Sequence, residues 1–323
     1  MKTVLVTGAS GFIGKAVCRA LFLKYRIIAL DRNPCFDSQS NPISVTADIE
    51  DETAIKYICT TYLPDVVIHC AGLAHQNFPT KKGADSYERI NCLATERLAY
   101  CAAASNPDLY FIFLSSIAVY GENQVNPIVC ETDSCVPTSQ YAESKLSAEN
   151  KLIDLYHKAI LKKLDILRLA PVYDNEWGFN LEKRVFAPQK ILYLRFGSGE
   201  QRMSALARLN LLEFIDFRLK QMINRHGFNI FNVCDEQPYS FNEIIEVFQK
   251  TKHQPQRMVV KIPLHIIGAP TLLMGWLLRS KSVWIRSFYY KLAKDLVFDN
   301  KRMLDTGFKP RLSLKSVFIH NGI

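Results

Sequence analysis

The sequence predicts an α/β protein built on a doubly wound, mostly parallel sheet. Short β-branched runs alternate with longer amphipathic segments through the first half of the 323 residues, and a glycine-rich turn separates the first run from the first amphipathic segment. Strands that alternate with helices form right-handed βαβ units. Ligands of such sheets bind beyond the carboxyl ends of the strands, so a site is expected in the loops after them.

The expected elements can be assigned in order along the chain. Strands are expected at short apolar, β-branched runs, namely 3–6, 26–30, 43–46, 65–69, 109–114 and 165–169. Helices are expected where apolar residues recur with helical spacing, at 12–24, 52–62, 86–104 and 140–161. After Pro171 the alternation ends, with a loop-like segment at 174–208, helices at 209–225 and 241–251, and a strand at 228–233. We therefore expect a first domain at 1–173 and a smaller lobe at 174–323, whose strands can return to the first domain.

Composition excludes several classes of protein. Forty Lys and Arg against 31 Asp and Glu give a net charge of +9, which suits an anionic ligand, a membrane surface or nucleic acid. No basic run is interleaved with aromatic residues, so nucleic-acid binding is not expected. The nine cysteines form no CxxC pair, and no histidines have metal-ligand spacing. Neither a metal site nor a disulfide framework is expected, and the cytoplasm is the expected compartment.

A glycine-rich motif, Thr-Gly-Ala-Ser-Gly-Phe-Ile-Gly at 7–14, comes directly after the first strand and opens the first helix. Gly8 permits a tight turn, Gly11 lets the backbone approach a pyrophosphate, and Gly14 lets the helix pack on the strand. N–H groups at the start of the helix can bind phosphates. In this context the motif predicts a Rossmann-type dinucleotide site, with contacts from Gly8, Ser10, Gly11, Phe12, Ile13 and Gly14.

The end of the second strand indicates which dinucleotide binds. Asp31 lies where a carboxylate binds both ribose hydroxyls and repels a 2′-phosphate, so NAD is the expected cofactor. Arg32 is the next residue, and a guanidinium there can accommodate that phosphate, so NADP stays open.

A second motif carries the chemistry. Tyr141 and Lys145 are four residues apart, so their side chains share one face of a helix. Lys145 is expected to lower the pKa of the Tyr141 phenol and to bind the nicotinamide ribose, so that Tyr141 exchanges a proton with an alcohol. Ser115 and Ser116 come just past the expected strand at 109–114, where a hydroxyl can bond the same substrate oxygen.

Together these motifs resemble the extended short-chain dehydrogenase/reductases, specifically the NAD-dependent epimerase/dehydratase family that acts on nucleotide sugars. The resemblance is strong over 2–173 and weak over 174–323. It implies that Ser116, Tyr141 and Lys145 are the catalytic triad, with exchange of Ser115 and Ser116 left open. Further cofactor contacts that it implies come from Asp48, Ile49, Cys70, Ala71, Gly72, Asn91, Ser115, Tyr141, Lys145 and Pro171. The lobe is expected to bind substrate, and the substrate contacts are Ser116, Tyr141, Asn180 and Arg202. A homodimer through 86–104 and 140–161 is a further implication.

The reaction depends on the two residues after Ser116. A 4,6-dehydratase needs an acid and a base there, and the chain has Ile117 and Ala118, which transfer no proton. This disfavours a dehydratase and leaves two reactions. Asp31 suits a retained NAD and so favours a 4-epimerase of a UDP-hexose or UDP-N-acetylhexosamine that works through a 4-keto intermediate. The alternative is an NAD(P)H-dependent 4-ketoreductase of an NDP-4-keto-6-deoxy sugar in surface-polysaccharide synthesis. A non-catalytic dinucleotide-binding sensor or scaffold is the second alternative.

Three segments bear on location and on the remaining histidines. The apolar run at 4–6 is too short for a signal-peptide core. The apolar stretch 262–278 is interrupted by prolines and glycines and leads into aromatic and basic residues, so within 262–291 a helix packed on the lobe is favoured over peripheral membrane contact. His69 is expected to be a satisfied core residue, and His75 a loop residue near the sugar site.

Overall fold

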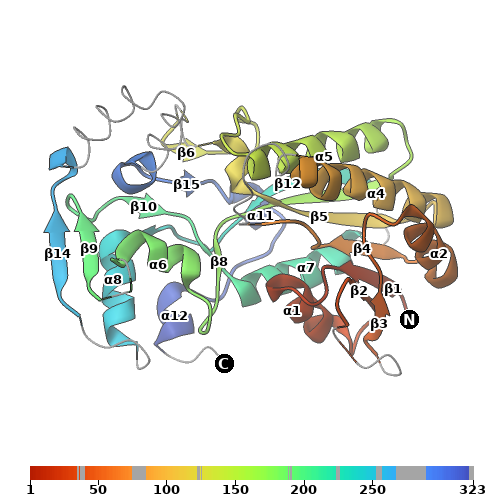
Figure 1. Cartoon of the computed structure of the whole chain (residues 1–323), viewed down its shortest axis with the longest axis horizontal. Helices are drawn as coiled ribbons and strands as arrows, with labels where there is room; N and C mark the ends of the chain where they lie inside the picture. The colour runs from red at the N-terminus through yellow and green to blue at the C-terminus, as the bar shows by residue number, and fades with distance from the viewer. Residues whose placement is uncertain are drawn as a thin grey trace. The chain divides into compact units, whose positions relative to one another are not determined.

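The computed structural model describes residues 1–34, 36, 41–74, 85–121, 124, 126–187, 189, 191–222, 226–251, 257–266 and 289–319 (Figure 1). By its contacts the chain forms two compact units. Unit 1 comprises 1–119, 139–168 and 212–231, and unit 2 comprises 120–138, 169–211 and 232–323. The chain thus passes between the units several times, and segment 212–231 returns to unit 1.

The largest sheet confirms the expected fold class. Among the described residues it has seven strands in the order β12-β7-β5-β4-β1-β2-β3. The bounds are β1 Thr3–Thr7, β2 Arg26–Asp31, β3 Ile43–Thr46, β4 Val66–His69, β5 Tyr110–Ser116, β7 Lys163–Leu169 and β12 Gly227–Val233. The pairs β1–β2, β1–β4, β2–β3 and β4–β5 are parallel, and Thr7 is in register with His69. The carboxyl ends of β1 and β4 therefore lie side by side.

Helices cover both faces of this sheet. Helices α2 (Glu52–Tyr62), α4 (Ala94–Ser105) and α5 (Gln140–His157) lie on one face, and α1 (Phe12–Leu21) lies on the other with α7 (Arg208–Met222) (Figure 1). The core on the α2–α4–α5 face is apolar and fully buried, with Leu98, Phe111 and Leu152 among its residues. Burial of this apolar surface is the main force that holds the helices on the sheet.

Local signals explain where these helices begin and end. Helix α2 begins after Asp51, whose carboxylate accepts the Ala54 N–H, and ends at Leu63 in the left-handed conformation. Helix α5 begins after Ser139, whose hydroxyl accepts the Ala142 N–H. It ends earlier than expected, because Ala159 has φ +57° and breaks the helical path.

The helix expected at 86–104 is not uniform. Residues Glu88–Leu93 form a π-helical turn, η1, which continues directly into α4. π-Helical turns are rare and frequently lie at functional sites. Here the wider turn carries the fully buried Asn91.

Unit 2 has short elements around its own core. Its bounds are η2 Ile117–Tyr120, which overlaps the boundary, β6 Ile128–Val129, β8 Val172–Tyr173, α6 Phe179–Val185, β9 Tyr193–Phe196, β10 Arg202–Met203, β11 Leu206–Ala207, β13 Tyr239–Ser240, α8 Phe241–Lys250, β14 Val259–Ile262, β15 Val297–Phe298, α11 Lys301–Leu304 and α12 Leu314–Phe318. The segment 174–208, expected to be loop-like, therefore holds a helix and three short strands. Its apolar residues pack with α8 and α12, and strands this short give little periodic signal.

A buried carboxylate organises unit 2. Asp235 accepts hydrogen bonds from the hydroxyls of Tyr173 (2.6 Å) and Tyr239 (2.9 Å). It also accepts the Asn210 amide (2.7 Å) and the Ala207 N–H (2.8 Å). Four donors on one carboxylate satisfy it fully, which is what burial of a polar group requires.

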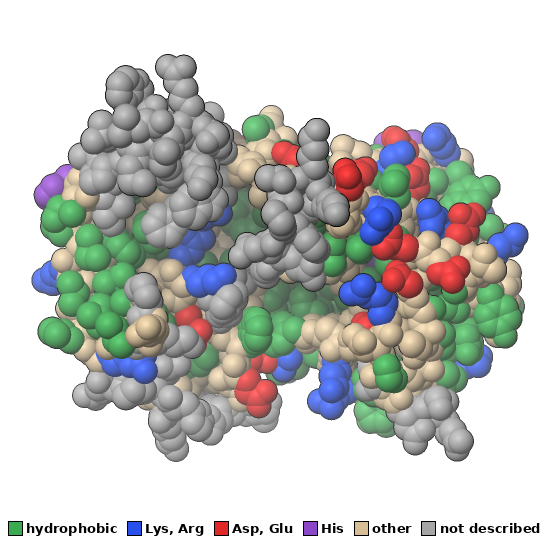
Figure 2. All heavy atoms as spheres, in the orientation of Figure 1, with side chains coloured by type: hydrophobic (Ala, Val, Ile, Leu, Met, Phe, Trp, Pro, Cys, Tyr) green, Lys and Arg blue, Asp and Glu red, His purple; other side chains and the backbone are tan. Residues whose placement is uncertain are grey.

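The surface of unit 1 over α2 and α4 carries both signs of charge, interspersed in the face that Figure 2 shows. Ion pairs join Arg89 to Glu50, Arg97 to Glu52 and Lys151 to Glu96. Within the described residues no helix is both long and apolar enough to span a membrane. The aromatic and basic residues at 276–286, and His75, lie outside the described residues.

Candidate cofactor pocket and active site

The glycine-rich turn adopts a conformation that only glycine accommodates. Gly8 has φ +65°, and a Cβ there would lie 2.7 Å from the Ala71 backbone nitrogen. A Cβ on Gly14 would lie 2.2 Å from the Gly8 carbonyl oxygen. Non-bonded contacts of Cβ atoms in proteins are essentially never this short, so these two glycines allow β1, α1 and the loop after β4 to meet. Gly11 caps α1 without a side chain, which leaves the N-terminal N–H groups accessible to an anion.

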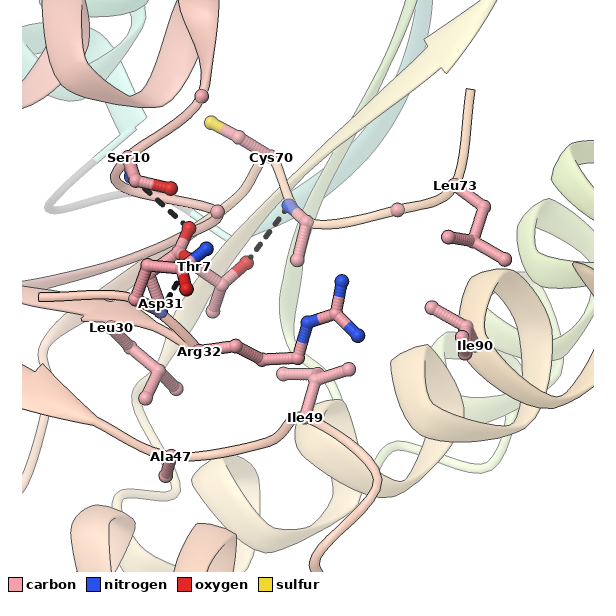
Figure 3. Close-up of a pocket in the computed structure, with 15 residues that line it drawn as sticks. Thr7, Ser10, Leu30, Asp31, Arg32, Ala47, Ile49, Cys70, Leu73 and Ile90 are labelled. Atoms are coloured by element: carbon pink, nitrogen blue, oxygen red, sulfur yellow. Dashed lines mark hydrogen bonds between the residues drawn. The ribbon is translucent and has the colours of Figure 1, made fainter. Parts of the chain in front are cut away.

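A pocket opens at the carboxyl ends of β1, β2 and β4 (Figure 3). Its lining brings together nine of the residues predicted for the cofactor, namely Gly8, Ser10, Gly11, Asp31, Arg32, Ile49, Cys70, Ala71 and Gly72. The other lining residues are Thr7, Leu30, Asn33, Ala47, Leu73 and Ile90. Apart from Ile90, these are direct sequence neighbours of the motifs, so the rule that ligands bind at strand ends could have found them.

Asp31 shapes the pocket at the end of β2. Its carboxylate accepts the Ser10 N–H at 3.1 Å and the Asn33 N–H at 3.0 Å, which joins the glycine-rich turn to the loop after β2. Arg32 extends its guanidinium over Ile49 in the pocket (Figure 3). Both groups that bear on the choice between NAD and NADP therefore line the same cavity.

The remaining predicted cofactor residues do not line this pocket. The Asp48 carboxylate accepts the Glu50 N–H at 2.9 Å, and so holds the turn that presents Ile49. Phe12, Ile13 and Gly14 lie within the first turn of α1. Pro171 belongs to unit 2.

Asn91 joins the cofactor loop to the helix that carries Tyr141. Its amide oxygen accepts the Leu73 N–H (2.7 Å), and its amide nitrogen donates to the Leu73 carbonyl (3.1 Å) and to the Ser144 hydroxyl (3.0 Å). Asn91 is fully buried. Asn91 thus holds the loop after β4 against helix α5, and its direct contact with the cofactor stays a prediction.

The two serines at the end of β5 have different partners. The Ser116 hydroxyl is hydrogen-bonded to the phenol of Tyr141. The Ser115 hydroxyl donates to the buried carboxylate of Glu149 at 2.5 Å. Successive side chains of a strand point to opposite faces, so only one of the two can face Tyr141. A cofactor contact of Ser115 would have to use its backbone.

Tyr141 lies near the start of α5, half-buried, with the ring of Tyr87 edge-on at 6.3 Å. Burial raises the pKa of the Tyr141 phenol, the Ser116 hydrogen bond lowers it, and Tyr87 raises it. The spacing predicted that Lys145 lowers the pKa of Tyr141, but Lys145 is not among the causes of the shift.

The reason lies in where the Lys145 ammonium points. It donates to the Leu114 carbonyl at 2.9 Å and lies 4.7 Å from the centre of the Phe113 ring. Burial lowers the pKa of Lys145 to about 8, and Cys70 and Glu149 partly offset this. A Cβ on Gly72 would lie 3.4 Å from its nitrogen. Lys145 thus lies beside Gly72 of the pocket, and its binding of the nicotinamide ribose stays a prediction.

Two of the predicted substrate residues, Asn180 and Arg202, lie in unit 2. The side chain of Asn180 lies outside the described residues, although its backbone belongs to α6. Arg202 is exposed, with its guanidinium 3.5 Å from the Asp295 carboxylate. Among the described residues no group of His, Cys, Asp and Glu is arranged to hold a metal ion.

Comparison with known proteins identifies the family. Residues 4–216, more than half of the chain, match the model of the NAD dependent epimerase/dehydratase family. The chain belongs to this family. The family predicted from the motifs is thereby confirmed, and so is NAD as its cofactor.

Two of the curated relatives are 4-epimerases. An N-acetyl-alpha-D-glucosaminyl-diphospho-ditrans,octacis-undecaprenol 4-epimerase of Escherichia coli O157:H7 is 28% identical over 271 residues, 82% of this chain and 77% of that protein. A UDP-glucose 4-epimerase of Vibrio cholerae is 29% identical over 220 residues, 65% of this chain and only 64% of that protein. The structure of UDP-glucose 4-epimerase from Brucella ovis in complex with NAD has a TM-score of 0.76 at 18% identity and covers 100% of this chain and 98% of that chain. This likeness shows the fold.

Proposed function

We propose that the protein is an NAD-dependent 4-epimerase of a sugar carried on a diphosphate, with a UDP-hexose or UDP-N-acetylhexosamine as substrate. The observation that carries the proposal is the Ser116–Tyr141 hydrogen bond, with Lys145 one turn further along α5 and beside Gly72 of the pocket. A hydroxyl, a phenol and an ammonium group arranged next to a dinucleotide pocket suit proton exchange with a sugar hydroxyl.

Each group has a distinct role in this reaction. NAD, when bound, supplies the site that accepts the C4 hydride and returns it. Tyr141 takes the proton of the C4 hydroxyl and later gives it back, while Ser116 orients the same oxygen. Lys145, whose nitrogen lies beside Gly72 of the pocket, would hold the ribose, and the hydrogen bond from Ser116 supports the charge that develops on Tyr141. Between the two proton transfers a 4-keto sugar would turn over in the site and present its other face, so that C4 would be inverted.

A polyprenyl diphosphate is a second candidate for the group that carries the sugar. The relative from Escherichia coli O157:H7 acts on an undecaprenol-linked sugar. The apolar stretch 262–278 and the aromatic and basic residues after it suit a lipid surface. With this carrier the enzyme would work at the membrane surface, and the sugar chemistry at Tyr141 would be unchanged.

A 4-ketoreductase is the alternative reaction, and the position of Arg32 in the pocket favours it because that residue can accept the phosphate of NADP. The cofactor content of purified protein distinguishes the two. An epimerase returns its hydride in each cycle and retains near-stoichiometric NAD. A reductase releases the spent cofactor, so its site would take up NADH or NADPH when titrated.

The test combines cofactor release with turnover. Protein purified without added cofactor is denatured and the released nucleotide quantified, and native protein is then given UDP-N-acetylglucosamine or undecaprenyl-diphospho-N-acetylglucosamine. We expect bound NAD and the C4 epimer of one of these substrates. Tyr141→Phe should lower turnover by roughly 10²–10⁴-fold with NAD still bound. Bound NAD without turnover on either carrier would favour a sensor, and unchanged turnover in Tyr141→Phe would overturn the mechanism.

We propose further that the enzyme is a cytoplasmic homodimer that pairs through α4 and α5. Exposed Leu93 in η1 and Tyr100 in α4 support such an interface. For 262–291 a helix packed on the lobe stays the prediction, with membrane contact as the alternative. Sedimentation of the purified protein tests the dimer, and cell fractionation of a variant that lacks 263–290 tests the membrane contact. Unchanged membrane recovery would argue against it.

A further inference from the structure

Three polar side chains form a buried cluster next to the proposed catalytic groups. Glu149 is fully buried, and Ser115 and Arg168 are 3% and 4% exposed. The Glu149 carboxylate accepts the Ser115 hydroxyl at 2.5 Å and the Arg168 guanidinium through Nε at 3.1 Å and Nη2 at 2.7 Å. The proposed roles of Ser116, Tyr141 and Lys145 do not use this cluster.

The cluster joins three elements at the level of the site. Ser115 ends β5 directly before Ser116, Arg168 lies near the end of β7, and Glu149 lies one turn beyond Lys145 on α5. Lys145 itself donates to the carbonyl of Leu114. Consecutive turns of α5 therefore hold consecutive residues of β5, Lys145 through Leu114 and Glu149 through Ser115.

A buried ion pair is costly to desolvate, and an apolar replacement is often at least as stable, so stability alone does not explain its presence. Directional hydrogen bonds do define a position more narrowly than apolar packing does. The position of α5 relative to β5 matters here, because Tyr141 lies on α5, Ser116 lies on β5, and both must bond to one substrate oxygen.

We propose that Ser115 and Glu149 are positioning residues, which with Arg168 fix helix α5 on strand β5 so that Ser116, Tyr141 and Lys145 are held in reactive geometry. This inference rests on the proposed function, and it assigns to Ser115 a role on the helix-facing side of the strand. The hydroxyl of Ser115 acts through Glu149 and touches neither sugar nor cofactor.

A second cluster of the same kind provides a matched control. At the other end of β5, Tyr110 donates its hydroxyl to Asp165 at 2.5 Å, and Asp165 is paired with Arg218 at 2.7 Å. All three are buried. Tyr110→Phe and Ser115→Ala thus each remove from β5 a hydroxyl that donates to a buried ion pair. Only Ser115 lies next to the site.

We expect Ser115→Ala to lower kcat about tenfold with the KM for substrate and the NAD content changed less than about twofold, because misplacement of reacting groups slows chemistry more than binding. Ser115→Thr keeps a hydroxyl and should restore most of kcat. Tyr110→Phe should keep the wild-type kcat at a temperature where each variant is folded. Wild-type kcat in Ser115→Ala, or an equal loss in Tyr110→Phe, would overturn the proposal.

A second measurement does not depend on turnover. In protein labelled with ¹³C at lysine Cε, the resonance of Lys145 is assigned by its loss in Lys145→Arg, and its titration is compared with that in Ser115→Ala. Loss of the hydroxyl frees the turn of α5 without changing any charge near Lys145, so a shift of the Lys145 midpoint would report movement of the helix. An unchanged midpoint would count against the proposal. Inactive wild-type protein would instead count against the proposed epimerase, and the titration would still test the positioning.

Discussion

The Nε2 atom of His69 lies 2.8 Å from the hydroxyl oxygen of Thr95, and this contact determines which ring nitrogen carries the proton. The Thr95 hydroxyl donates to the Asn91 carbonyl at 2.7 Å, so it accepts from Nε2–H. Nδ1 then accepts from the Thr7 hydroxyl at 2.6 Å. Both nitrogens are satisfied in a fully buried ring, which makes His69 a core residue, as expected from its apolar strand.

The neutral state of His69 predicts a pH dependence of stability. Burial lowers the pKa of His69 from 6.5 to about 3 in the folded protein. Between these values the unfolded chain binds a proton that the folded protein does not, so the free energy of unfolding falls as the pH falls below 6.5. From pH 7.5 to 5.5 this loss amounts to about 1.4 kcal/mol. His69→Gln should lack it, and urea unfolding at both pH values measures the difference. Equal losses in both proteins would contradict the prediction.

The buried charge of Lys145 should lower the free energy of unfolding of the protein. Its pKa is about 8 instead of 10.5, so at pH 7 the folded protein holds the buried ammonium at a cost of up to about 3 kcal/mol. Lys145→Met removes this cost but also removes the hydrogen bond to the Leu114 carbonyl, which offsets about 1 kcal/mol of the gain. We expect the free energy of unfolding at pH 7 to rise by about 1–2 kcal/mol while turnover is lost.

Lys151→Met is the control for this measurement. Lys151 lies on the same helix but is 43% exposed and paired with Glu96. Its replacement should change the free energy of unfolding by less than about 0.5 kcal/mol. A Lys145→Met variant that is less stable than the wild type would show that the hydrogen bond outweighs the burial of charge.

Alanine substitutions at two glycines of the same motif should have different effects, one on folding and the other on cofactor binding. Alanine at Gly14 would place its Cβ 2.2 Å from the Gly8 carbonyl, so Gly14→Ala should lower the free energy of unfolding by about 1–3 kcal/mol. Alanine at Gly11 meets that same oxygen at 3.1 Å, with φ at −72°. Gly11→Ala should stay near wild-type stability and weaken NAD binding. Thermal unfolding and calorimetric titration with NAD would measure both, and similar stability losses would argue against this separation.

The preference for NAD over NADP should depend on Asp31. Its carboxylate lines the pocket and would repel a 2′-phosphate, whereas a neutral amide at this position would not, and Arg32 lines the same pocket. Asp31→Asn should therefore raise the affinity for NADP relative to NAD by about tenfold, which is about 1.4 kcal/mol. Asp51→Asn removes a nearby carboxylate that caps α2 and should leave the ratio unchanged. An unaltered ratio in Asp31→Asn would show that Arg32 or the backbone determines the choice.

Much of the fold could be predicted because its signals are local. The strands at 26–31, 43–46 and 66–69 lie within a residue or so of their expected positions, since a buried parallel strand is a short, uninterrupted apolar run. The π-helical turn at Glu88–Leu93 could not be predicted. Its residues have ordinary helical periodicity, and the widened turn is associated with the contacts that Asn91 makes to Leu73 and Ser144.

The sequence by itself determined the glycine-rich side of the dinucleotide pocket, because residues 7–14 are contiguous. Each glycine there lies too close to its chain neighbours or to the loop after β4 for a larger side chain to fit without adjustment. The sequence also determined that Tyr141 and Lys145 share a helical face. Only the tertiary structure decided that Ser116 faces Tyr141 while Ser115 binds Glu149, and that Lys145 donates to Leu114. The reason is physical: buried polar groups must find partners, and those partners are 19 to 34 residues away in the chain, brought within reach only when α5 packs on the sheet.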